Sequence, residues 1–280
     1  MMLMLSALHL ALTKSPYFTE THRAFILEGC SEATAGFRRA VDNISESNCH
    51  VVQGFPFTLS IYALALPLLD REDKSEHAIL DELTRILTLI GTNSVVDNKL
   101  IPFMSERHID WWIKGDEFLV GPDGLEPHME LTRALESLHP WIDSSDDEPV
   151  VRGVNTLAVQ VYVRAIKHFP LRQNLRPITF PTLISPEYRH ILGQRNPMAL
   201  VILAHWAVTL WDCREQWWCS NWGVRVVSVV ALFLPERYAG ALRYPLEKLN
   251  LQRHTKEDFL RILHGDEVSA AELQISAPKP

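Results

Sequence analysis

Apolar residues recur along the chain at intervals of three and four residues, the spacing of helices that bury one face. Over 76–90, for example, Ile79, Leu83, Ile86 and Leu87 share one side of a helix. The alternation of apolar and polar residues that marks a half-buried strand is rare. The pattern predicts helices over 3–13, 21–41, 47–69, 76–90, 125–138, 153–168, 198–211, 223–234 and 256–263.

Prolines and acidic residues divide these predicted helices. Pro197 stands at the favoured first position of its helix, whereas Pro56 lies inside one and is expected to kink it. The stretch 169–186 holds four prolines and is expected to be extended, and 143–149 is expected to be an acidic, solvated loop. These two stretches could separate the chain into two halves, but neither half alone can bury its apolar helix faces. We therefore predict one all-α domain over 1–280, a multi-helix globule with an apolar interior pocket.

The charge balance argues against direct contact with nucleic acid. The formal net charge is −7, with 47% hydrophobic and 22% charged residues. Lysine and arginine are scattered, whereas binding to phosphate backbones needs a basic stripe. We therefore expect a soluble protein that does not bind nucleic acid directly.

Neither a membrane span nor a disulfide or zinc site is indicated by the sequence. The apolar stretch 3–12 lacks the preceding basic residue and the cleavage site of a signal peptide, and 199–210 is too short to cross a bilayer. The cysteines form no closely spaced pair, and zinc sites need such pairs. We expect four reduced thiols, at Cys30, Cys49, Cys213 and Cys219, in a cytoplasmic or nuclear protein.

Two blocks of the sequence resemble a known family. The first comprises 5–11, the Phe-Arg pair at 37–38, and Ser-Asn-Cys at 47–49 with the apolar run to 65; the second comprises 197–207, the Trp-Trp pair at 217–218, Asn-Trp-Gly at 221–223, and 242–246. In this order they resemble the C-terminal ligand-sensing domain of fungal zinc-cluster transcription factors of the sterol-uptake-control type. The blocks span nearly the whole chain.

This resemblance implies an all-α domain whose hydrophobic pocket binds a sterol and thereby controls a regulator. Members of the family bind DNA through a separate N-terminal six-cysteine zinc cluster and a basic linker, and this sequence has neither. Two further positions depart from the family pattern. Asn221 replaces a glycine and is expected to keep a left-handed turn, and Tyr244 replaces a tryptophan that precedes proline.

Tryptophans gather near the second block, where five of the eight fall within 17 residues. They suit either core packing or the wall of a site for fused rings, because indole is large, rigid and apolar with one donor. His205, in the apolar helix, is either a core histidine or a polar contact inside a pocket. The predicted ligand-binding residues are Phe55, Phe57, Tyr62, His205, Trp206, Trp217, Trp218 and Trp222.

Motifs of catalysis are absent from the sequence: it has no nucleophile elbow, phosphate-binding loop or zinc-protease motif. The acidic run 143–148 is interpreted as a solvated loop rather than a metal site. His108 and Asp110, beside two tryptophans, form either an ordinary amphipathic helix or an acid–base pair. If the protein is an enzyme, the candidate catalytic residues are His205, Tyr62, His108 and Asp110, and neither cofactor nor metal is predicted.

Two functions remain open on this sequence. One is a ligand-binding regulatory module for a sterol- or terpenoid-like molecule, which acts through a DNA-binding protein partner or as a homodimer. The other is a stand-alone, cofactor-independent enzyme of terpenoid metabolism: a cyclase, an isomerase or a Diels–Alderase-type pericyclase. A dry cavity can accelerate such reactions by holding one folded conformer, and a hydrogen bond can polarise a carbonyl.

Overall fold

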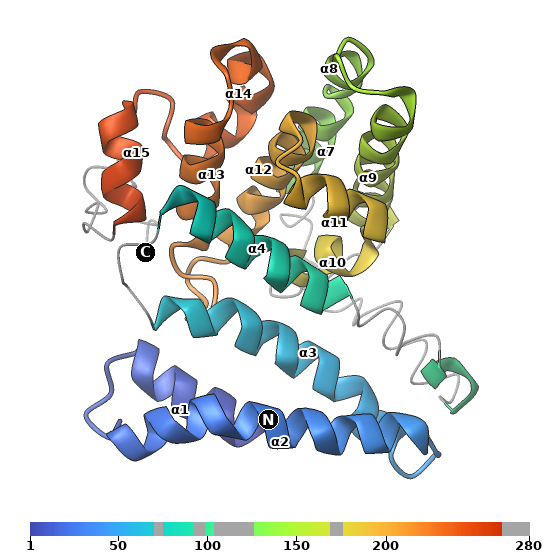
Figure 1. Ribbon diagram of the computed structural model, residues 1–280, viewed down its shortest axis with the longest axis vertical. Helices are drawn as coiled ribbons and strands as arrows, with labels where there is room; N and C mark the ends of the chain where they lie inside the picture. The colour runs from blue at the N-terminus through green and yellow to red at the C-terminus, as the bar shows by residue number, and fades with distance from the viewer. Residues whose placement is uncertain (70–74, 92–98, 104–125, 169–175, 265–280) are drawn as a thin grey trace.

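The computed structural model describes residues 1–69, 75–91, 99–103, 126–168 and 176–264 (Figure 1). All regular secondary structure within these ranges is helical, which confirms the predicted all-α fold. The bounds are α1 Met2–Leu12, α2 Glu20–Asp42, α3 Cys49–Ala65, η1 Leu66–Leu68, α4 Glu76–Gly91, η2 Ile101–Phe103, α7 Glu126–Glu136, α8 His139–Asp143, α9 Pro149–His168, α10 Arg176–Leu183, α11 Pro186–Gly193, α12 Pro197–Asp212, α13 Trp222–Phe233, η6 Glu236–Tyr238, α14 Ala239–Lys248 and α15 Lys256–Leu263.

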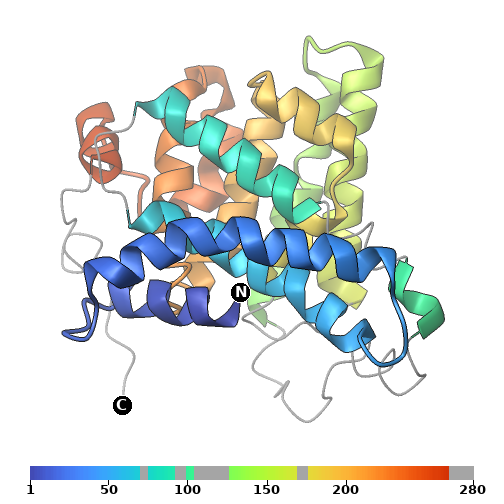
Figure 2. The ribbon, with the colours of Figure 1, turned by 60° about the horizontal axis from the view of Figure 1, so that its bottom comes forward.

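The helices form two parts that pack on each other. Helices α1, α2 and α3 make a layer at one end of the molecule, which we call the N-terminal layer (Figures 1 and 2). Helix α4 lies between this layer and the remaining helices, and it contacts α3, α10, α11 and α13. We call α4 together with α7–α15 the main bundle.

Helix α12 is the centre of the main bundle. Every side chain from Met198 to Trp211 is buried, and α7, α9, α10, α11, α13 and α14 all contact the helix. Pro197 opens it as predicted, and the side chain of Asn196 accepts a hydrogen bond from the backbone N–H of Ala199 at 3.0 Å. A helix that is apolar on all sides is stable in water only when other helices cover every side of it.

Helices α12 and α13 approach each other closely at Gly223. A Cβ atom placed there would lie 2.8 Å from the backbone nitrogen of Trp211 and 2.9 Å from the carbonyl oxygen of Ala207. These are backbone atoms of α12, so the helices would have to separate to admit a methyl group. The Asn-Trp-Gly triplet therefore ends in glycine for a packing reason.

We expect Gly223→Ala to lower the free energy of unfolding by about 2 kcal/mol, because it overpacks this crossing. Urea denaturation followed by circular dichroism measures the change. Gly153→Ala on α9 is the matched control, since its added Cβ meets nothing within 4 Å, and alanine favours helix over glycine. A Gly223→Ala protein as stable as the wild type would contradict the close crossing.

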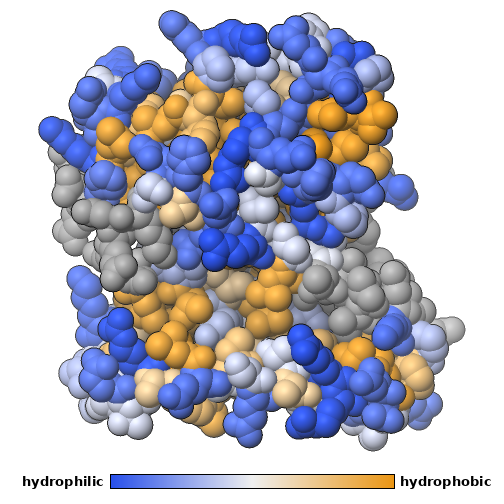
Figure 3. Space-filling model, in the orientation of Figure 1, coloured by the Kyte–Doolittle hydropathy of each residue, from blue (hydrophilic) through white to orange (hydrophobic). Residues whose placement is uncertain are grey.

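Helix α3 is a long apolar helix of the N-terminal layer. Among the described helices, Cys49–Leu68 alone is long and apolar enough to cross a membrane, and less than half of its most apolar window is buried. Apolar surface is visible over α3 in Figure 3. However, α3 contacts α1, α2 and α4, and its Leu64 carbonyl accepts a hydrogen bond from the main bundle. A single helix of this kind is weak support for a span, because core helices share its composition.

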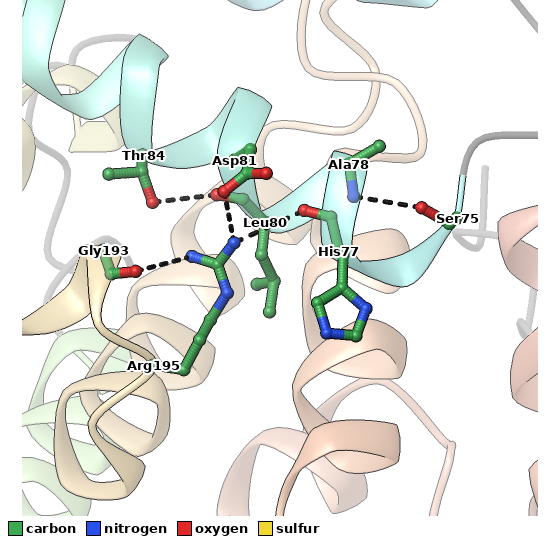
Figure 4. A network of polar contacts seen from close by, with 8 residues as sticks. All are labelled: Ser75, His77, Ala78, Leu80, Asp81, Thr84, Gly193 and Arg195. Carbon is green, nitrogen blue, oxygen red and sulfur yellow. Dashed lines mark hydrogen bonds and ion pairs between the residues drawn. The ribbon is translucent and has the colours of Figure 1, made fainter.

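A polar network at the edge of the main bundle joins α4 to the turn before α12 (Figure 4). Arg195, whose φ of 63° is left-handed, forms an ion pair with Asp81 of α4. The same guanidinium donates to the carbonyl oxygens of Gly193 at 3.3 Å and His77 at 3.4 Å. The network fixes the course of the chain from α11 into α12.

The observed helices differ from the predicted ones in several places. The predicted extended stretch 169–186 contains α10, a helix that includes Pro181, while 169–175 lie outside the described residues. Helix α9 begins at Pro149, earlier than predicted, and α8, α11 and α14 were not predicted. Helix α3 contains Pro56, as predicted, but ends at Ala65 rather than at 69. The left-handed residue before α13 is Ser220, with φ 38°, whereas Asn221 has φ −91°.

Candidate functional site

The predicted ligand-binding residues lie in separate parts of the fold. Phe55, Phe57 and Tyr62 belong to α3, in the N-terminal layer. His205 and Trp206 belong to α12, and Trp222 opens α13. The remaining two, Trp217 and Trp218, lie in the connection between α12 and α13.

The three aromatic residues of α3 make different contacts. Phe55 stacks on Phe37 of α2, with ring centroids 4.2 Å apart, and Phe57 is exposed. Tyr62 is buried and its hydroxyl donates to the carbonyl oxygen of Ile26 at 2.8 Å. Burial, and then the neighbouring Cys30 thiol, raise the pKa of Tyr62 to about 12. Tyr62 therefore ties α3 to α2, and its proton is poorly placed for acid catalysis.

The tryptophans do not form one wall. Trp206 donates from Nε1 to the carbonyl oxygen of Pro177 on α10 at 2.9 Å, and Trp222 donates to that of Leu64 on α3 at 2.6 Å. Both are fully buried. Trp217 is half-buried, with His9 of α1 at its edge and the ring centroids 5.2 Å apart. These indoles connect α12, α13 and their linker to three different neighbours, which is a packing role.

His205 occupies the most distinctive polar position of the interior. It is 1% exposed, and its Nδ1 lies 2.9 Å from the carbonyl oxygen of Val201. Because a carbonyl only accepts, Nδ1 carries the proton and donates. Burial lowers the pKa of His205 to about 4, so the ring is neutral at physiological pH. Nε2 then has a lone pair, and no described residue is hydrogen-bonded to it.

Tyr244 of α14 faces this imidazole. The two rings lie nearly parallel, with an interplanar angle of 18° and centroids 5.9 Å apart. The Tyr244 hydroxyl is buried and has no hydrogen-bond partner among the described residues. Burial raises the pKa of this phenol well above its usual value, and the carboxylates of Asp212 and Glu130 raise it further.

An ion pair at the surface joins two of the surrounding helices. Glu130 of α7 accepts a hydrogen bond from Lys248 of α14 at 2.8 Å, which bridges the two helices. Thr132, also on α7, is buried, and its hydroxyl has no partner among the described residues. Buried polar groups usually have partners. We call His205 and Tyr244 the polar pair, and we take their surroundings between α7, α12 and α14 as the candidate site.

The polar pair suits hydrogen bonding better than proton transfer. His205 is a weak base because its cation would be buried, and Tyr244 is a weak acid because its anion would be buried beside carboxylates. At neutral pH the two groups offer a neutral acceptor and a neutral donor inside an apolar bundle. Such groups orient a bound molecule.

The sequence identified His205 but missed its companion. Tyr244 entered only as a departure from the family pattern, and α14 was not predicted, so nothing brought it toward α12. The candidates His108 and Asp110 lie outside the described residues. Within the described ranges, no group of three or more histidine, cysteine, aspartate or glutamate side chains is placed to hold a metal ion.

The comparisons with known proteins identify no relative. No family model matches the chain, and no curated protein and no solved structure matches it.

Proposed function

We propose that the protein binds a hydrophobic polycyclic small molecule, sterol- or terpenoid-like, within the main bundle. The observation that carries this proposal is the polar pair: the buried hydroxyl of Tyr244 has no hydrogen-bond partner among the described residues, and it lies beside the neutral, buried imidazole of His205. Ligand sites for apolar molecules combine apolar surroundings with a few polar groups that fix orientation. The resemblance of the sequence to a sterol-sensing domain supports the same ligand class.

In this proposal the chain is a ligand-binding regulatory module that does not itself contact DNA. It acts through a protein partner that binds DNA, or as a homodimer, in the cytoplasm or the nucleus. Its net charge of −7 disfavours direct binding to nucleic acid. Ligand binding would be transmitted through α12, because this helix contacts six other helices of the bundle.

The second candidate is a cofactor-independent enzyme of terpenoid metabolism, and the Tyr244 hydroxyl favours it. A buried donor without a partner can polarise a carbonyl of a bound polyene and so promote a cycloaddition. The ionisation preferences of the polar pair restrict this candidate to reactions without net proton transfer. A pericyclic reaction meets that restriction.

A binding and turnover experiment separates the two candidates. Purified protein is titrated with dehydroergosterol, an intrinsically fluorescent sterol, and energy transfer from tryptophan reports binding. We expect saturable transfer that unlabelled sterol abolishes. The protein is then incubated with linear polyene terpenoids without cofactor, and mass spectrometry seeks products of unchanged mass. Binding without such products supports the module, and products above the uncatalysed background support the enzyme. Absence of saturable binding and of products contradicts both.

A further inference from the structure

We propose that Cys213 and Cys219 are a dithiol that peroxide converts into a reversible disulfide, which fixes the connection between α12 and α13. We call these two cysteines the thiol pair. Cys213 directly follows α12, and Cys219 lies three residues before the start of α13. Both carry reduced thiols in this structure. The inference concerns a different chemistry from ligand binding and does not depend on the proposed function.

The backbone of the connection brings the two thiols together. The N–H of Gln216 donates to the carbonyl oxygen of Cys213 at 2.9 Å, and the N–H of Cys219 donates to that of Gln216 at 2.9 Å. These two successive turns place the Cys219 thiol in a hydrogen bond with the Cys213 thiol. Cysteines whose side chains point apart cannot be bridged without movement of the backbone. The thiol pair already points together.

Burial and the hydrogen bond give the two thiols different roles. Cys213 is 4% exposed and Cys219 is fully buried. Burial, then the hydrogen bond and the charge of Cys213, raise the pKa of the Cys219 thiol well above its ordinary value. The proton therefore stays on Cys219, whose S–H donates to the sulfur of Cys213. Cys213 is thus the thiol that reacts first, and the depth of the pair restricts the oxidant to a small molecule such as hydrogen peroxide.

One molecule of hydrogen peroxide balances the reaction. The Cys213 thiolate attacks a peroxide oxygen, the O–O bond breaks, and the departing hydroxide takes up the proton that Cys213 released to become water. The Cys219 sulfur then attacks the sulfur of the resulting sulfenic acid. The S–S bond forms and the S–O bond breaks, and the second hydroxide leaves with the Cys219 proton as water. Both sulfurs are oxidised and the peroxide is reduced.

The other two cysteines provide an internal comparison. Cys30 of α2 is hydrogen-bonded to the Tyr62 hydroxyl, and the Cys49 thiol donates to the carbonyl oxygen of Glu46 at 3.4 Å. The contact atom is an oxygen in each case, and an oxygen cannot resolve a sulfenic acid into a disulfide. A sulfenic acid at Cys30 therefore proceeds to sulfinic acid, which thiols do not reverse. In the thiol pair the neighbouring sulfur intercepts it.

The disulfide would restrain the connection between two helices that are buried along most of their length. It closes a ring over 213–219, beside the close crossing of α12 and α13 at Gly223. A covalent ring of this kind limits the freedom of the chain when it opens. We therefore expect the backbone amides of 216–222 to exchange on the order of tenfold more slowly in the oxidised protein than in the reduced protein.

Peptide mapping tests the proposal on the purified full-length protein. Hydrogen peroxide is raised until Cys30, which is only partly buried, is oxidised. The remaining thiols are blocked with N-ethylmaleimide in denaturant, and trypsin is added without reductant. Trypsin cuts after Arg214, between the two cysteines, so a disulfide holds peptides 196–214 and 215–225 together. We expect these linked peptides to predominate, and dithiothreitol to separate them. Recovery of Cys213 and Cys219 as N-ethylmaleimide adducts or as sulfinic acids would overturn the proposal.

Variants assign the roles within the pair. Cys219→Ala removes the resolving thiol, so oxidation of Cys213 should end in sulfinic acid that dithiothreitol does not reverse. Cys30→Ser is the matched control, and it should form the linked peptides like the wild type. If oxidation of Cys213 in Cys219→Ala is as reversible as in the wild type, Cys219 is not its partner and the proposal is wrong. The wild-type peptide map decides the case without any variant that fails to fold.

Discussion

Trp222→Ala is expected to lower the free energy of unfolding by about 4 kcal/mol, as is usual when a large buried aromatic residue is truncated. Trp222 is fully buried at the start of α13. Its Nε1 donates to the Leu64 carbonyl at 2.6 Å, which joins the main bundle to α3. The substitution leaves a cavity and removes the hydrogen bond that links the two parts of the fold. Urea denaturation followed by circular dichroism measures the loss.

A second tryptophan provides the control for this prediction. Trp217 is half-buried in the connection before α13. Trp217→Ala should therefore lower the free energy of unfolding clearly less than Trp222→Ala does. Hydrogen exchange should show faster exchange in α1–α3 for Trp222→Ala than for Trp217→Ala, because only the first variant loses the hydrogen bond to α3. Equal losses of stability, with unchanged exchange in α3, would show that Trp222 does not hold the N-terminal layer.

His205 is expected to make the protein less stable as the pH falls from about 6.5 to about 4. Its pKa in the folded protein is about 4, against an ordinary value of 6.5, because burial disfavours the cation. Below pH 6.5 the unfolded chain takes up a proton that the folded chain refuses until about pH 4. The contribution of His205 to the free energy of unfolding is therefore fully present above about pH 6.5. It declines between about pH 6.5 and about pH 4, and below pH 4 it decreases no further. The loss amounts to roughly 3 kcal/mol.

Substitution isolates this effect from other titrating groups. His205→Asn removes the titration while its amide can still donate to the Val201 carbonyl, so the difference in unfolding free energy between variant and wild type should shrink as the pH falls. If the difference for His205→Asn is the same at pH 7 and pH 4.5, the imidazole is not held neutral by burial.

Much of the helical architecture could be predicted from the spacing of apolar residues. The predicted stretch 256–263 coincides with α15, and α1, α4, α12 and α13 begin and end within one residue of their predictions. Helices that contain proline were harder to predict from the sequence. Prolines led us to expect 169–186 to be extended, yet Pro181 lies inside α10 and is buried against the bundle. Tertiary packing there outweighs the helix-breaking tendency of proline.

The candidate site was less accessible to sequence reasoning. The clustering of tryptophans along the chain suited either core packing or the wall of a site, and it could not say which neighbours each ring contacts, because consecutive positions on a helix point in different directions. His205 thus faces α14, while Trp206 faces α10. Tyr244, which stacks on His205, follows it by 39 positions in the sequence. It belongs to α14, a helix whose many polar residues obscure the apolar pattern of its buried face. Only the packing of α14 on α12 reveals the pair.

The location of the bound molecule is the central claim, and photocrosslinking tests it most directly. A sterol bearing a diazirine in its ring system is irradiated with the purified full-length protein, and the labelled peptides are identified by mass spectrometry. We predict labels on α7, α12 or α14 that excess cholesterol suppresses. Labels confined to the exposed face of α1–α3, or labels that excess cholesterol fails to suppress, would contradict a ligand site at His205 and Tyr244.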